Sequence, residues 1–165
     1  MSTLSPTSLA AQAVSQLNSA QEYFNRSTRN LTESHSALTP AAGMMSAAQQ
    51  VAHAAQTVDW FMEGAFRPEG FDLDFEGHAT EVAAVTSLGA ARAWLDRAFA
   101  SARDLIATKS DAELMAPIAD GPIMGGAPRM AVFGGITDHT AHHRGALTVY
   151  ARLAGAVPPM PYADA

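Results

Sequence analysis

Three of the six histidines in this 165-residue chain fall within one short segment, as His139, His142 and His143. Residues four apart on a helix project to the same side, so His139 and His143 would share the apolar face of a helix, with His142 at its margin. Two imidazoles buried one turn apart need polar partners, and a divalent metal ion would satisfy both. The alternative is a pair of buried histidines that are hydrogen-bonded to backbone carbonyls.

The residues around these histidines exclude several kinds of metalloenzyme and thiol enzyme. The spacing matches that of the metalloprotease pattern His-Glu-x-x-His, but Thr140 occupies the position of the glutamate that acts as general base. Di-iron bundles need Glu-x-x-His pairs on two helices, and the chain has none. Cysteine is absent, which removes disulfides, thiolate ligands and a cysteine nucleophile.

A third ligand would have to come from another element. His53 is the strongest candidate because it falls in the middle of a predicted helix; the alternative is a histidine at the rim of that helix. His35 and His78 fall in predicted loops and are expected to be surface residues. The aromatic residues nearby are expected to pack in the interior rather than to line a pocket: Trp60, Phe61 and Tyr150.

Four long helices would position these residues. Apolar residues recur with the 3.6-residue period of a helix in four segments separated by loops that carry Gly and Pro: residues 6–30, 46–66, 87–109 and 129–154. Ser46 and Gln49 form a capping-box pattern at the start of the second segment. Residues 67–80 and 115–128 are predicted to be irregular connections. Because no sustained period-2 alternation occurs, the pattern predicts an all-α fold, a four-helix bundle with long loop connections.

Composition and charge limit the classes of function. The length fits a single domain over residues 1–165, and 48% hydrophobic residues exclude a disordered chain. With 10 Lys+Arg against 16 Asp+Glu, the chain lacks the basic surface that nucleic-acid binding needs. No apolar run is long enough to span a bilayer, and the first twenty residues lack the basic residues of a secretion signal. We therefore expect a cytoplasmic protein without nucleic-acid or membrane partners.

Several motifs, in the same order along nearly the whole chain, resemble the DinB/YfiT-like family. They are Gly43-Met44-Met45-Ser46 before Val51-Ala52-His53, then Trp60-Phe61, then the segment from Asp138 to Gly145 with Leu147 and Tyr150. The resemblance implies an up-down-down-up four-helix bundle, often dimeric, with a divalent metal held by His53, His139 and His143. Ala146 departs from the family pattern, because many relatives carry Gln at this position.

The resemblance also implies a chemistry, since relatives include transferases and isomerases that use low-molecular-weight thiols such as mycothiol or bacillithiol. Three imidazoles leave an open position on zinc, as in catalytic sites, and imidazole ligands favour zinc or nickel. The predicted function is a metal-dependent enzyme of the thiol S-transferase or hydrolase type, with a small-molecule substrate. The alternative is a non-enzymatic bundle in which the ion is structural and the surface serves protein interaction. The catalytic residues stay unknown, with Asp59 and Glu63 as candidate general bases.

Overall fold

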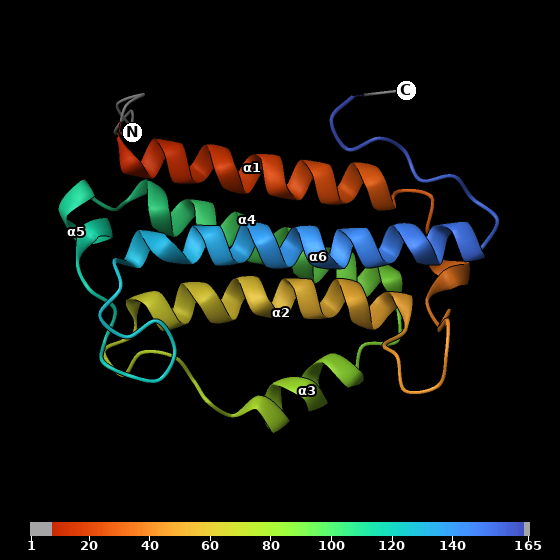
Figure 1. Cartoon of the computed structure of the whole chain (residues 1–165), viewed down its shortest axis with the longest axis horizontal. Helices are drawn as coiled ribbons and strands as arrows, with labels where there is room; N and C mark the ends of the chain where they lie inside the picture. Colours follow the sequence, from red (N-terminus) through yellow and green to blue (C-terminus); the bar gives the residue numbers. More distant parts are fainter. Residues whose placement is uncertain (1–7, 164–165) are drawn as a thin grey trace.

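Four long helices that lie side by side form the body of the protein (Figure 1). The computed structural model describes residues 8–163, and within them the structure is all-helical, with no strand. The long helices are α1 (Leu9–Thr28), α2 (Ala47–Phe66), α4 (Leu88–Ala107) and α6 (Val132–Leu153). Both α1 and α2 pack against α4 and α6. In Figure 1, α1 and α6 run from left to right, while α2 and α4 run from right to left.

Serine side chains fix where three of the long helices begin. Ser8, Ser46 and Ser87 each precede a helix and accept a hydrogen bond from a backbone N–H in its first turn. The predicted capping box is confirmed, because the Gln49 side chain also accepts from the Ser46 N–H at 2.8 Å. The predicted start of the first helix at Pro6 lies outside the described residues.

The predicted apolar stripes meet in one core. Its largest fully buried side chains on the long helices come from α1, α4 and α6 and include Leu17, Phe24, Leu95, Phe99, Ile136 and Leu147. Helix α2 contacts α3, α4 and α6 and is buried on most of its surface, largely through alanines. Small side chains let neighbouring helices approach closely, so polar residues on α2 are enclosed as well.

None of the helices in residues 8–163 combines the length and apolar character that a bilayer crossing requires.

The prediction that residues 67–80 are irregular is wrong in part, because a further helix, α3 (Phe75–Ala83), begins within them. The Asp74 carboxylate caps it by accepting a hydrogen bond from the Gly77 N–H at 2.9 Å. Isolated helices this short are marginal in water, so contacts with α2 must stabilise α3; its buried residue is Val82. The missed helix matters, because it covers the candidate site.

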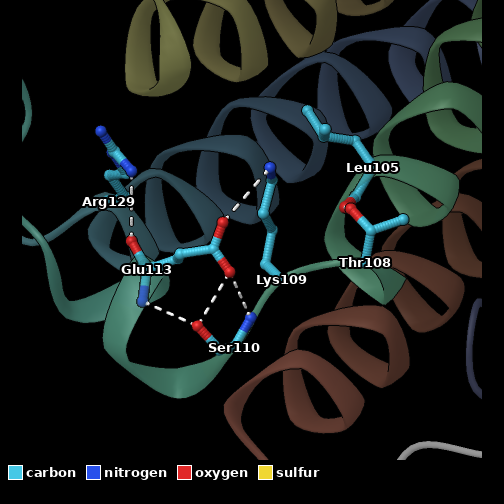
Figure 2. A network of polar contacts seen from close by, with 6 residues as sticks. All are labelled: Leu105, Thr108, Lys109, Ser110, Glu113 and Arg129. Atoms are coloured by element: carbon cyan, nitrogen blue, oxygen red, sulfur yellow. Dashed lines mark hydrogen bonds and ion pairs between the residues drawn. The ribbon is translucent and has the colours of Figure 1, made fainter.

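A further short helix that was not predicted, α5 (Asp111–Met115), lies between α4 and α6 and ends where the predicted connection of residues 115–128 begins. A polar network holds it (Figure 2): the Ser110 N–H and hydroxyl both donate to Glu113 Oε2, at 2.9 and 2.8 Å, and Lys109 lies 3.6 Å from the same carboxylate. Arg129 donates to the Glu113 carbonyl oxygen at 3.5 Å. Arg129 begins the 3-10 helix η2 (Arg129–Ala131), which leads directly into α6. The network therefore helps to fix where α6 starts.

Candidate metal centre

Three histidines from two helices converge in the interior. Helix α2 supplies His53, and α6 supplies His139 and His143, one turn apart. One ring nitrogen of each lies within 4.8 Å of those of the other two. The ring centroids are 5.0 Å apart for His53 and His139, 4.9 Å for His53 and His143, and 4.5 Å for His139 and His143. The structure thus brings the three predicted residues together, and their role as ligands stays a prediction.

The nitrogen geometry of the pair on α6 fits a zinc-sized ion. The Nε2 atoms of His139 and His143 lie 3.3 Å apart. Tetrahedral zinc with Zn–N bonds of about 2.0–2.1 Å places its ligand nitrogens roughly 3.3 Å from one another. The donor set contains three imidazoles and no carboxylate, which suits zinc or nickel better than magnesium.

A chain of hydrogen bonds behind His143 fixes which ring nitrogen faces the cluster. Since an amide oxygen can only accept, the His143 Nδ1–H donates to Gln50 Oε1 at 2.5 Å. The Gln50 amide nitrogen in turn donates to the Tyr150 hydroxyl at 3.4 Å, and that hydroxyl donates to the Met45 carbonyl oxygen at 2.7 Å. This arrangement leaves the Nε2 lone pair of His143 free for an ion, as outer hydrogen bonds commonly do at metal sites.

Sequence reasoning missed Gln50, although a signal was present. Gln50 is a polar residue one turn before His53, on a helix whose buried residues are mostly apolar, and it is 9% exposed. Buried polar side chains normally have a specific partner, so its position could have suggested support for a ligand. Tyr150 was correctly predicted to be in the core, with 1% exposure.

Burial keeps all three histidines neutral at pH 7. Burial first, and then the neighbouring histidines, lower the pKa of His143 from 6.5 to about 3. The pKa of His139 is lowered to about 4, mainly by burial and then by His53 and His142, while Asp138 acts to raise it. The pKa of His53 is lowered by burial and by His142. Because neutral imidazole is the form that binds metals, the site is ready for an ion at neutral pH.

A cavity of about 350 Å³ adjoins His53 and His139, between α2 and α3. The prediction that Trp60 and Phe61 only pack in the interior is wrong, because both line this cavity. The prediction that His78 is a surface residue is also wrong: its side chain is 24% exposed and lines the same cavity from α3. His35 is likewise half-buried rather than a surface residue; it lies in η1 (Glu33–His35), where its Nδ1 accepts a hydrogen bond from the Thr32 N–H at 3.0 Å.

The two candidate general bases do not line this cavity. Asp59 accepts a hydrogen bond from the Trp94 indole N–H at 2.7 Å, and burial raises its pKa against the effect of that bond. With Glu63, it lines a smaller adjoining hollow, which shares Trp60 and His78 with the cavity. Neither carboxylate is among the described residues that line the cavity beside His53, so the structure does not place a general base next to the histidines.

Replacing Gln50 by leucine is expected to weaken zinc binding by about 10- to 100-fold, the usual effect of removing an outer-shell partner. The change leaves His143 Nδ1 without its acceptor, so the ring is free to turn and to change tautomer. Competition with a chromophoric chelator at neutral pH measures the affinity. Tyr150→Phe is the graded comparison, since it removes the bonds that the hydroxyl makes with Gln50 and Met45 but keeps the acceptor for His143 Nδ1, so its effect should be smaller. Wild-type affinity in Gln50→Leu would contradict the role of Gln50.

Comparisons with known proteins agree with the family predicted from the motifs. Residues 16–147 match the family model of the DinB superfamily. The structure is similar to the crystal structure of a DinB-like protein from Bacillus cereus ATCC 10987, with a TM-score of 0.57 and 21% identity over 91% of this chain and 93% of that chain. No curated protein matches the chain. Because the family match covers well over half of the sequence, the chain belongs to the DinB superfamily.

Proposed function

We propose that this chain is a divalent-metal-binding DinB-like protein. In this proposal His53, His139 and His143 hold zinc or nickel, and the ion serves a reaction of the thiol S-transferase or hydrolase type. One observation carries the proposal: three imidazoles with neutral rings converge at the edge of an apolar cavity. Three protein ligands leave a coordination position for water or substrate. The cavity supplies the space in which a substrate would meet that position.

The residues of the chain have distinct parts in this proposal. A bound zinc ion would supply Lewis acidity and would favour the thiolate form of a coordinated thiol. Gln50 orients His143, and α3 covers the cavity beside His53, which limits the access of water. Since the chain contains no cysteine, a thiol nucleophile has to come from a cosubstrate. This cosubstrate loses its proton to solvent, and its sulfur bonds to the electrophilic carbon of the second substrate while the bond from that carbon to the leaving group breaks and the leaving group departs with the electron pair.

A second function is favoured by the position of the ligands. His53 lies on α2, while His139 and His143 lie on α6, so an ion bound by all three would tie these helices together. No carboxylate lines the adjoining cavity within the described residues. A structural ion, with a surface that serves protein interaction, is therefore the alternative to catalysis.

We also propose an up-down-down-up four-helix bundle formed as a single domain over residues 1–165. The course of the four long helices in Figure 1 supports this topology.

The family resemblance supports a homodimer. The absence of cysteine together with the charge of −6 supports a cytoplasmic protein without nucleic-acid or membrane partners. Sedimentation of the purified protein measures the oligomeric state.

Metal analysis and thiol binding test the proposed function together. The purified protein is expected to hold about one divalent ion per chain, with zinc or nickel outcompeting magnesium because the ligands are nitrogens. Cobalt-substituted protein is then titrated with bacillithiol, mycothiol, glutathione and coenzyme A, and its visible spectrum should change with at least one of them. Equal metal content in wild type, His139→Ala and His143→Ala would rule out the site.

Turnover is measured by conjugation of the same thiols to chlorodinitrobenzene, in which the sulfur–carbon bond forms as chloride leaves. Zinc-loaded wild type should accelerate this reaction, and folded His143→Ala should not. If no thiol alters the cobalt spectrum, the transferase proposal fails, and a structural ion becomes the better account of the three histidines.

A further inference from the structure

The cavity between α2 and α3 has mainly apolar walls, although amide, hydroxyl and imidazole groups also line it. None of the described residues that line it is Lys, Arg, Asp or Glu, and aromatic and aliphatic side chains dominate the surface. Trp60 forms the centre of an aromatic group, with ring centroids 5.2 Å from Phe61 and 6.2 Å from Phe75. His53 and His139 lie at one side of the cavity.

Contacts at both ends of α3 hold the cavity open. Before the helix, the Trp60 indole N–H donates to the Asp72 carbonyl oxygen at 2.8 Å. Phe71 packs so closely on Gly64 that a Cβ there would lie 2.3 Å from its ring. At the other end, the Gln49 amide donates to the Ala83 carbonyl oxygen at 3.2 Å. Both ends of α3 are thus fixed beside α2 (Figure 1), and the residues of α3 between these ends line the cavity.

We propose that this cavity binds a small, uncharged molecule with an aromatic or aliphatic body, and that such a molecule is the electrophilic or hydrolysable substrate of the adjoining site. The second clause rests on the proposed function, while binding itself requires no ion. The volume falls within the range of small-molecule pockets, and the flat rings of Trp60 and Phe75 offer stacking surfaces. A charged group would lose its hydration without gaining a carboxylate, lysine or arginine as its partner, so the cavity selects against anions and cations.

Two probes that share a ring system but differ in charge test this inference. N-phenyl-1-naphthylamine is neutral, anilinonaphthalenesulfonate carries a negative charge, and both fluoresce more strongly in apolar surroundings. Each is titrated into the full-length protein with and without zinc. We expect saturable binding of the neutral probe to one site per chain, with or without zinc. The sulfonate should bind at least about tenfold more weakly, because no lysine or arginine lines the cavity to offset the lost hydration of its charge.

Substitutions on α3 locate the bound probe. Ala79 is exposed on the helix surface but lines the cavity, so Ala79→Trp should fill the space and weaken binding by about tenfold or more. Ala84, which is also exposed and ends the same helix, does not line the cavity, and Ala84→Trp should bind as the wild type does. Phe75→Ala, at a position that is 56% exposed, removes one wall and should also weaken binding.

Three results would overturn the inference: no saturable binding of the neutral probe, equal or tighter binding of the sulfonate, or unchanged affinity in both Ala79→Trp and Phe75→Ala. The circular dichroism of each variant shows that it is folded. Failure here is distinct from failure of the proposed function, because metal content is measured separately. If the protein binds zinc but not the neutral probe, the inference about the cavity is wrong and the metal site stands. If it binds the probe but no metal, the metal site is wrong and the inference about the cavity stands.

Discussion

Zinc at a thousandfold excess over its Kd is expected to raise the Tm of the wild-type protein by roughly 8–16 °C. An ion that binds only the folded state stabilises it by RT ln(1 + [L]/Kd), which is about 4 kcal/mol at that excess. For a protein of this size each kcal/mol shifts the Tm by roughly 2–4 °C. Scanning calorimetry with zinc and with a strong chelator measures the difference. The chelated protein should still unfold cooperatively, because the core formed by the long helices does not depend on the ion.

The histidines on α6 provide matched controls for this experiment. His139→Ala and His143→Ala should lose nearly all of the zinc-dependent rise, because each removes one of the three nitrogens. His142→Ala should keep it, since His142 is exposed and lies outside the cluster although it is next to His143 in the sequence. A full rise in His143→Ala, or none in the wild type, would show that zinc does not bind where proposed.

Zinc affinity is expected to change by less than about tenfold between pH 7.5 and pH 5.5. Three ordinary imidazoles with a pKa of about 6.5 would each lose roughly tenfold at pH 5.5, or about a thousandfold together. Here burial lowers the pKa of His139 to about 4 and of His143 to about 3, and that of His53 is also lowered. Protons therefore compete weakly with zinc over this range. Calorimetric titration in non-chelating buffers measures the affinity, and a thousandfold loss would contradict the lowered pKa values.

The same shifts predict how the stability of the metal-free protein depends on pH. The pKa values of His139 and His143 lie below 6.5 in the folded state and near 6.5 in the unfolded state, so the unfolded chain takes up protons first as the pH falls. Stability rises with pH wherever the unfolded state binds more protons. The contribution of the neutral histidines to the free energy of unfolding is therefore fully present above pH 6.5, and it is lost as the pH falls toward 4. Urea unfolding of chelated protein at pH 7.5 and pH 5.5 measures the loss, and equal stability would contradict it.

The sequence by itself determined the features that follow local rules. Apolar residues with a helical period and serine caps such as Ser46 located the four long helices, because both signals act within one or two turns. The placement of His139 and His143 on one side of a helix follows from their spacing alone. The motifs also identified the DinB superfamily, which the family match confirms.

Only the tertiary structure decided which residues from distant parts of the chain meet. Gln50 and His143 form a hydrogen bond although 93 positions separate them in the sequence, and no local pattern specifies such a pair. Short helices such as α3 depend on packing for their stability, so the sequence pattern of residues 67–80 did not reveal the helix that carries His78 to the cavity. Trp60 and Phe61 line that cavity because α3 is held at both ends and does not fill it. Periodicity shows which face of a helix is apolar, but the packing of neighbouring elements decides whether that face becomes solid core or the wall of a site.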